Sequence, residues 1–316
     1  MSGGAAAGVA IREIDERELA VWVDVARSAG AGADSEEGYL DWKRQAPQTV
    51  WLLAERDGPV GAGRLTPGWH SPPAVALADV RVAPEARGHG IGVALLDALQ
   101  ARSDALGCPT LDGEVEERDA GSLAWARRLG FREIARRPRL TLALASVGEL
   151  AVDPPAGVEI VTWAERPELA RGIYEVACEA YPDEPGSTDE EVEPFEVWLS
   201  QDMQGSSDRP DAVFVALVDG AAVGYAKLAL SLARPGVVMH DMTGVKRAFR
   251  GRGIAGALKR AEIAWARRQG VEVLETRNHE RNAPILALNE RYGYQAGPGE
   301  VAVRRTEEER RALGLV

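Results

Sequence analysis

Residues 250–268 read RGRGIAGALKRAEIAWARR, a glycine-punctuated arginine cluster that leads directly into a segment with apolar residues at helical spacing. Residues 87–107, RGHGIGVALLDALQARSDALG, have the same shape. Glycine permits positive φ and close approach of the backbone, so successive amides at a helix start can converge on an anion. A glycine-rich turn by itself suits a simple helix cap equally well. The meaning of the stretch therefore depends on its surroundings.

The two stretches belong to an internal repeat. Arg87 and Arg250 are 163 positions apart, and the same offset separates LGF at 129–131 from YGY at 292–294. It also separates VGAGRL at 60–65 from VGYAKL at 223–228. Several landmarks at one offset indicate two copies of one fold.

The repeat predicts two domains, at 1–150 and 151–316, with the boundary near Pro154 and Pro155. Upstream of the first common hairpin the offset falls to 149, so the second copy carries extra residues. The acidic, proline-containing stretch YPDEPGSTDEEVEPFEVW at 181–198 is the expected insertion.

Composition limits the classes of partner. The chain has 316 residues with 37 basic and 49 acidic side chains, for a net charge of −12. So acidic a chain is a poor general binder of nucleic acid, because phosphate-backbone affinity needs many Lys and Arg contacts. Cys108 and Cys178 are far apart, which predicts neither a disulfide scaffold nor a metal site. With no secretory signal and no long apolar run, we expect a cytoplasmic protein that does not associate with membranes.

Each copy has the same order of expected elements. A strand and a helix precede a hairpin with a Gly-containing turn, as in VWLLAERDGPVGAGRL at 50–65. A further strand, VALADVRV at 75–82 or VVMHDMTGV at 237–245, leads into the arginine–glycine loop and a long helix. One more strand, a short helix and a last strand, LTLAL or EVAVRR, complete the copy. This order predicts an α/β fold of the mixed α+β kind, with helices packed on a mixed sheet.

Two other phosphate-binding patterns do not match the loop. The Walker pattern requires a Lys followed by Ser or Thr, which GRGIAGALK lacks. The dinucleotide fingerprint requires differently spaced glycines at the first strand–helix turn of the chain.

Each copy resembles a GCN5-related N-acetyltransferase (GNAT) domain, in which the signature Arg/Gln-x-x-Gly-x-Gly/Ala follows a strand. Arg87, Gly90 and Gly92 match that signature in the first copy, and Arg250, Gly253 and Ala255 match it in the second. The resemblance covers nearly the whole chain. It implies two GNAT-like domains, each with a mixed, mostly antiparallel sheet flanked by helices. It also implies that acetyl-CoA is the co-substrate and that a small-molecule amine is the acyl acceptor.

The resemblance also implies cofactor-binding residues. In the second copy these are Thr243, Gly244 and Val245 on the strand, Arg250, Gly251, Arg252, Gly253, Ile254 and Ala255 in the loop, and Asn282 at a later helix start. In the first copy they are Val80, Arg81 and Val82 on the strand, with Arg87, Gly88, His89, Gly90, Ile91 and Gly92 in the loop. The position of Asn282 is Asp119 in the first copy, where a negative charge is unfavourable near a polyanion. The C-terminal domain is therefore expected to be catalytic, and the degenerate N-terminal domain is expected either to bind CoA without turnover or to serve as structural support.

The catalytic groups are less well defined. For the base that takes the amine proton, the candidates are His240, Asp241 and Glu275, and strand alternation puts the first two on opposite faces. The family often places a tyrosine that protonates the leaving thiolate at the positions of Ala126 and Asn289. Asn289 donates a hydrogen bond but no proton, so water or Tyr292 is the alternative acid.

The sequence does not decide which amine accepts the acyl group. The carboxylates of the insertion (Asp183, Glu184, Asp189, Glu190 and Glu191) are expected either to attract a cationic amine or to form a solvated loop. Among tandem members, mycothiol synthase has a similar length and layout, and aminoglycosides or polyamines fit equally well. A non-catalytic acyl-CoA sensor is the main alternative, because the acid positions are degenerate. A purely structural scaffold is a third. Monomer and homodimer are both compatible with the sequence.

Overall fold

The computed structural model describes residues 8–30, 35–68, 74–185 and 192–314. Two compact units emerge from the contacts within the chain: residues 1–136 with 300–316, and residues 137–299. We call them unit 1 and unit 2. The predicted segments 1–150 and 151–316 describe the sequence repeat, and that division stays a prediction. The compact units differ from it because the two copies exchange their last strands.

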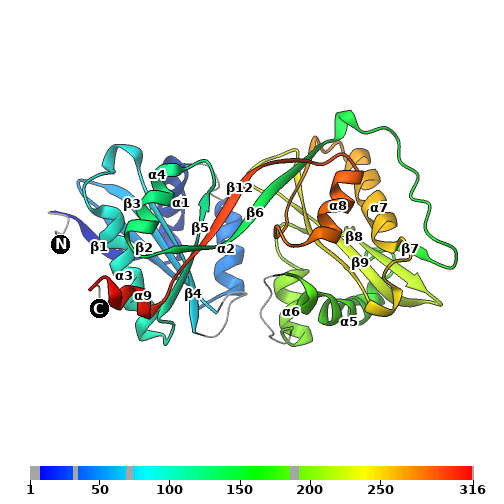
Figure 1. Ribbon diagram of the computed structural model, residues 1–316, viewed down its shortest axis with the longest axis horizontal. Helices are drawn as coiled ribbons and strands as arrows, with labels where there is room; N and C mark the ends of the chain where they lie inside the picture. The colour runs from blue at the N-terminus through cyan, green and yellow to red at the C-terminus, as the bar shows by residue number, and fades with distance from the viewer. Residues whose placement is uncertain (1–7, 31–34, 69–73, 186–191, 315–316) are drawn as a thin grey trace. The chain divides into compact units, whose positions relative to one another are not determined.

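Unit 1 has the expected element order with one addition, a second helix, α2 (Glu36–Gln45), before the hairpin (Figure 1). Its first elements are β1 (Ala10–Glu13), α1 (Leu19–Ser28), α2, β2 (Val50–Glu55), β3 (Pro59–Pro67) and β4 (Val75–Val82). They are followed by α3 (Ile91–Ala105), β5 (Thr110–Glu116), α4 (Ala120–Arg128) and, after the second copy, α9 (Glu307–Ala312). The strands lie in the order β1-β2-β3-β4-β5, with β4 and β5 parallel and the other neighbours antiparallel.

Unit 2 repeats this order. Its first elements are β7 (Glu159–Thr162), α5 (Ala170–Ala180), α6 (Phe195–Asp202), β8 (Asp208–Val218), β9 (Ala221–Leu230) and β10 (Val237–Val245). The remaining ones are α7 (Ile254–Arg268), β11 (Val273–Arg277) and α8 (Ala283–Arg291). The sheet order β11-β10-β9-β8-β7 mirrors that of unit 1, and β10 and β11 are again the parallel pair. The predicted mixed, mostly antiparallel sheet with flanking helices is confirmed.

The last strands correct one expectation, that LTLAL and EVAVRR would each complete its own copy. In β6 (Arg132–Ala143), residues 139–143 pair with β11 of unit 2. In β12 (Gln295–Arg305), residues 300–305 pair with β5 of unit 1. The alternating pattern fixes the face and register of each strand, but β5 and β11 are repeat equivalents that offer the same edge. The residue alternation in β6 and β12 could therefore not specify whether each strand pairs with β5 or with β11.

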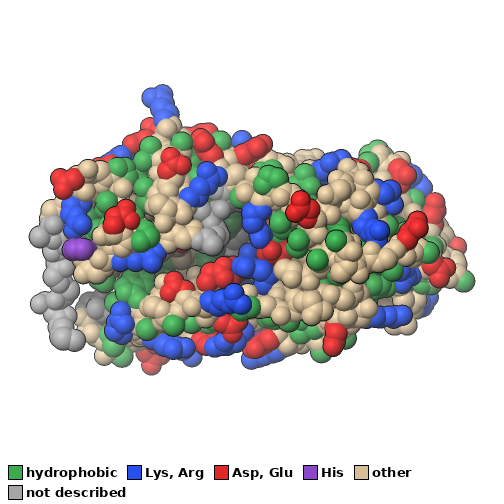
Figure 2. All heavy atoms as spheres, turned by 90° about the horizontal axis from the view of Figure 1, so that it is seen from above, with side chains coloured by type: hydrophobic (Ala, Val, Ile, Leu, Met, Phe, Trp, Pro, Cys, Tyr) green, Lys and Arg blue, Asp and Glu red, His purple; other side chains and the backbone are tan. Residues whose placement is uncertain are grey.

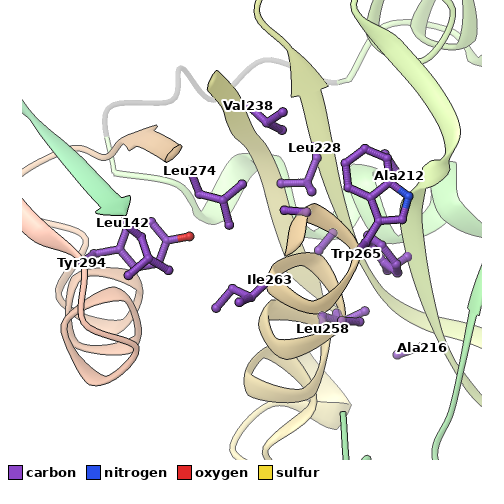
Figure 3. Close-up of a cluster of buried hydrophobic side chains, with 14 of the residues drawn as sticks. Leu142, Ala212, Ala216, Leu228, Val238, Leu258, Ile263, Trp265, Leu274 and Tyr294 are labelled. Atoms are coloured by element: carbon purple, nitrogen blue, oxygen red, sulfur yellow. The ribbon is translucent and has the colours of Figure 1, made fainter. Parts of the chain in front are cut away.

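Two apolar layers cover the two faces of the unit 2 sheet. On one face, α7 packs through Leu258, Ile263 and Trp265 on Leu228 and Leu274 (Figure 3). On the other, α5 and α6 pack on alternate residues of the same strands, such as Tyr225. The helices α5 and α6 lie together, away from α7 and α8 (Figure 1). Side chains at the centre of β10 are thus directed to one of two chemically separate layers.

Candidate active site

A cavity of about 680 Å³ lies in unit 2 where β10 and β11 separate. The two strands pair only from Val237 to Met239, opposite residues 273–275, and then diverge. Beyond that point Thr243, Gly244 and Val245 pair with β9 alone. Their free edge can pair with an extended ligand, in the manner of an added strand. The volume is typical of small-molecule sites.

The arginine–glycine loop forms the end of the cavity next to α7. Gly251 and Gly253 have φ of 73° and 82°, in the left-handed region that favours glycine, and Gly253 is the N-cap of α7. Within the described residues, the amides of 251–255 donate no hydrogen bond. A Cβ added to Gly251 would meet nothing within 4 Å, and one added to Gly253 would meet only Pro155, at 3.6 Å. The loop therefore has the donors and the room that a pyrophosphate group requires.

The arginines of this loop are held in place by specific partners. Arg250 donates from Nε to the Val245 carbonyl at 2.9 Å and pairs with Asp183 at 2.7 Å. Arg247 also pairs with Asp183, and these hydrogen bonds lower the pKa of the Asp183 carboxyl to about 2. Arg252 donates to the Ala248 carbonyl at 2.9 Å. The insertion is thus tied to the loop through Asp183.

Asn282 lies at the start of α8, a second helix that contributes to the cavity. It is the N-cap of α8, yet its side chain makes no capping hydrogen bond and lines the cavity. Its counterpart Asp119 caps α4 by accepting from the Ser122 amide at 2.9 Å and the Ser122 hydroxyl at 2.7 Å. The hydrogen bonds from Ser122 lower the pKa of Asp119. Asn282 is free to reach a ligand, whereas Asp119 is committed to its helix.

Asp241 is the predicted base with the most suitable placement. The pairing of β10 with β9 shifts between His240 and Met242, so Asp241 is the extra residue of a β-bulge. Its side chain is 51% exposed and lines the cavity, 2.9 Å from the Lys227 ammonium. Lys227 is also 2.8 Å from Asp208. Burial opposes the charged form of Lys227, but the two carboxylates prevail and raise its pKa.

Glu184 stands at the same wall of the cavity. Although its side chain is exposed, the protein packed around its carboxyl raises its pKa, and the nearby Asp241 charge raises it further. Asp183 and Asp241 line the same wall, where Asp183 is paired with Arg247 and Arg250 and Asp241 with Lys227. Asp189, Glu190 and Glu191, the other carboxylates expected here, lie outside the described residues.

The other predicted catalytic residues are placed less favourably. His240 lines the cavity, but its Nε2 bonds the Tyr294 hydroxyl and its Nδ1 faces Glu262. Glu275 is buried and pairs with Arg234 at 2.9 Å and Arg139 at 3.3 Å, outside the residues that line the cavity. Burial lowers the pKa of His240, which favours a neutral ring.

The two proposed acids also lie outside the cavity lining. Asn289 is fully buried and donates to Asn278 at 2.8 Å. The Tyr292 hydroxyl accepts from Arg260 at 2.8 Å and donates to the Gly256 carbonyl at 3.1 Å. The catalytic roles of both residues stay predictions that the geometry does not favour.

Several groups near the site were missed in the sequence, above all Lys259, which lines the cavity with 1% of its surface exposed. Its signal was present: α7 has charged residues at 259 and 262, where the first copy has Leu96 and Leu99. Lys227 had a signal too, because VGYAKL and VGAGRL both keep a basic residue at that place.

Comparison with known proteins agrees with the fold. A family model described as the acetyltransferase (GNAT) family matches residues 12–131 and 170–294, so the chain belongs to this family. A solved tandem GNAT protein from the clavulanic acid biosynthesis pathway superposes with a TM-score of 0.75 and 23% identity, over 94% of this chain and 98% of its own. A GNAT protein from Sphaerobacter thermophilus gives a TM-score of 0.72 and 22% identity, over 95% of this chain and 96% of its own. These two likenesses show the fold.

The curated relatives carry a more specific name. Mycothiol acetyltransferase of Mycobacterium avium is 29% identical over 226 residues, which is 68% of this chain and 66% of the relative. The protein of that name in Nocardia farcinica is 31% identical over 185 residues, 54% of this chain and 57% of its own length. The matches thus span less than two thirds of these relatives.

Two surface properties bear on partners. Acidic and basic side chains are interspersed over the face seen in Figure 2, which has no continuous basic surface. Among the described residues, no helix has both the length and the apolar character needed to cross a bilayer.

Proposed function

We propose that this protein transfers an acetyl group from acetyl-CoA to the amine of a small molecule, in the cavity of unit 2. One observation carries the proposal: a single cavity joins the arginine–glycine loop to the free edge of β10 and to the carboxylates of Asp241 and Glu184. The loop suits a pyrophosphate, the strand edge suits the extended arm that follows it, and a carboxylate in the cavity can accept a proton from an amine.

Three groups of residues have separate roles in this reaction. The loop amides of 251–255 and Asn282 hold the nucleotide end of the co-substrate. The backbone of Thr243, Gly244 and Val245 pairs with its arm and polarises the thioester carbonyl. Asp241 takes the proton of the attacking amine, since it is the predicted base whose carboxylate is in the cavity and accessible to solvent.

The test combines calorimetry with a thiol-release assay. Gly253→Asp puts a side chain on a left-handed residue and a negative charge in the anion site, so acetyl-CoA affinity should fall roughly 100-fold. Gly90→Asp makes the matched change in unit 1 and should leave turnover intact. Loss of turnover with Gly90→Asp alone would move the active site to unit 1. The acceptor panel includes polyamines, aminoglycosides and, because of the relatives' name, desacetylated mycothiol.

The degenerate acid positions favour a second candidate, a non-catalytic acyl-CoA sensor. Asn289 cannot give up a proton at neutral pH, and Ala126 has no polar group. This candidate predicts tight acetyl-CoA binding in unit 2 without thiol release for any amine.

A further inference from the structure

Four polar side chains form a buried cluster beneath the point where β10 and β11 separate. They are His240 on β10, Lys259 and Glu262 on α7, and Tyr294 just before β12. His240 Nδ1 is 3.1 Å from Glu262 Oε2, and Lys259 Nζ is 3.8 Å from the same oxygen. The Lys259 ammonium also lies 5.5 Å from the centre of the Tyr294 ring.

The cluster is buried at a cost to stability. Lys259 and Glu262 are 1% and 0% exposed, and neither Glu262 oxygen receives an aligned hydrogen bond within the described residues. A buried ion pair is commonly no more stabilising than apolar side chains of similar size. An incompletely satisfied one is worse than an apolar core. Packing alone therefore does not explain these residues.

The first copy shows that the fold does not need them. Strand registers match His240, opposite Leu228, with Ala78, opposite Leu65. The offset of the repeat matches the other three positions with Leu96, Leu99 and Phe131. All four counterparts are apolar: three belong to the buried apolar cluster of unit 1, and Ala78 packs against it. The same fold thus packs hydrophobic side chains at these positions in unit 1 and a charged cluster in unit 2.

The cluster lies next to the cavity in which the reaction is proposed to take place. Only His240 and Lys259 of the four line the cavity, together with Thr276, whose hydroxyl donates to the His240 carbonyl at 3.4 Å. These residues mark the apex of the strand separation, at the opposite end of the cavity from the arginine–glycine loop. A co-substrate whose pyrophosphate lies in the loop, and whose arm follows β10 from Val245 towards His240, brings its sulfur end to this apex.

Lys259 is the member of the cluster with a proton to give. Both ring nitrogens of His240 face other members of the cluster, and the Tyr294 hydroxyl is bonded to that ring. Burial lowers the pKa of Lys259 from its ordinary value towards that of a thiol, although Glu262 opposes the change. A proton donor whose pKa approaches that of the leaving group transfers its proton efficiently.

We propose that Lys259 is the acid that protonates the departing thiolate of CoA, in place of the degenerate position Asn289. Glu262, His240 and Tyr294 are positioning residues that hold the ammonium at the cavity. This proposal rests on the proposed function. The amine nitrogen bonds to the acetyl carbon, and Asp241 takes its proton. The carbon–sulfur bond breaks, its electron pair stays on sulfur, and Lys259 gives that sulfur a proton. Asp241 then loses a proton to water and Lys259 regains one, so the reaction balances.

The first test makes unit 2 resemble unit 1. Lys259→Leu/Glu262→Leu removes both charges together and leaves no lone buried ion. We expect acetyl-CoA affinity within about threefold of wild type and a fall in kcat of roughly 100-fold. A second readout needs no turnover: the ultraviolet absorbance of the thiolate, followed against pH with bound CoA. The thiol should titrate at least about one pH unit higher in the variant, because the neighbouring positive charge is gone.

Lys259→Arg keeps the charge and its pairing with Glu262 but offers no dissociable proton near neutral pH. It should fold like the wild type, keep the lowered thiol pKa and still lose kcat. It should also lose the alkaline limb of the kcat profile, where Lys259 deprotonates. Wild-type kcat in Lys259→Arg, or an unchanged thiol titration in the double variant, would overturn the proposal. Failure of wild-type unit 2 to bind acetyl-CoA would instead refute the proposed function.

Discussion

The two arginine–glycine loops have nearly the same geometry but different surroundings. Gly88 and Gly90 both have φ of 79°, close to the values of Gly251 and Gly253. Arg87 donates from Nε to the Val82 carbonyl at 3.0 Å, as Arg250 does to Val245 at 2.9 Å. Both loops follow a parallel strand pair that separates after three residues. Loop shape therefore follows from the shared fold and does not by itself identify an active site.

The differences lie next to the loops. The β3–β4 register runs without a shift, so β4 has no bulge there and no counterpart of Asp241. Where unit 2 has Lys227 beside two carboxylates, unit 1 has Arg64 stacked on Trp42 at 4.1 Å. The ring of Trp125 lies 3.3 Å from where a Cβ on Gly92 would be, whereas its counterpart Leu288 lines the unit 2 cavity. Beside its loop, unit 1 thus has an aromatic ring where unit 2 has a leucine that lines the cavity.

The largest effect should come from the bulge residue. Asp241→Asn keeps the shape and the contact with Lys227 but removes the proton acceptor, so kcat should fall by about 100- to 10,000-fold with little change in acetyl-CoA affinity. Steady-state thiol release with calorimetry measures both. Asp79→Asn removes a carboxylate from the corresponding strand of unit 1 and should leave kcat unchanged. If Asp241→Asn retained wild-type kcat, the base would have to be sought elsewhere, with Glu184 the next carboxylate in the cavity.

An intermediate effect should follow from exchanging Leu288 of α8 with its unit 1 counterpart, Trp125 of α4. Leu288→Trp places the bulk of Trp125 in the unit 2 cavity, and acetyl-CoA affinity there should fall about 10- to 100-fold. Trp125→Leu opens the same place in unit 1 and should create or strengthen a second binding event. Calorimetric stoichiometry of the wild type and both variants measures this. Unchanged binding in Leu288→Trp would show that the co-substrate does not pass between α7 and α8.

The sequence predicts the fold well, because strand alternation, glycine turns and the repeat all depend on local spacing. The strand VVMHDMTGV appears as β10 with the same bounds. The exchange of β6 and β12 could not be predicted, since it is a choice between two equivalent sheet edges. The bulge at Asp241 was also hidden, because it follows from strand register rather than composition. Lys259 could have been found by comparing the copies position by position, as a charge on a helix face that is apolar in the other copy.

The smallest effect, on stability, should come from the residues that bind the loop arginines Arg250 and Arg87. Asp183 binds Arg247 and Arg250 in unit 2, whereas Arg87 in unit 1 donates to the Ala29 carbonyl. The hydrogen bonds from the two arginines lower the pKa of Asp183 from 3.8 to about 2. The Asp183 carboxyl thus binds its proton less tightly in the folded state than in the unfolded state. The stabilisation is full above about pH 4 and is lost as the pH falls towards 2.

The effect should be modest and weakened by salt, because the Asp183 side chain is exposed to solvent. Chemical denaturation of Asp183→Asn and wild type from pH 6 to 2 should show a stability difference that shrinks below about pH 4. Arg87→Gln is the matched change in unit 1, since the Ala29 carbonyl does not titrate. Its stability difference should change less over this range, because the Arg87 charge is only a minor cause of the lowered pKa of Asp119. A difference for Asp183→Asn that stayed flat down to pH 2 would mean that the carboxylate does not stabilise the unit 2 loop through its charge.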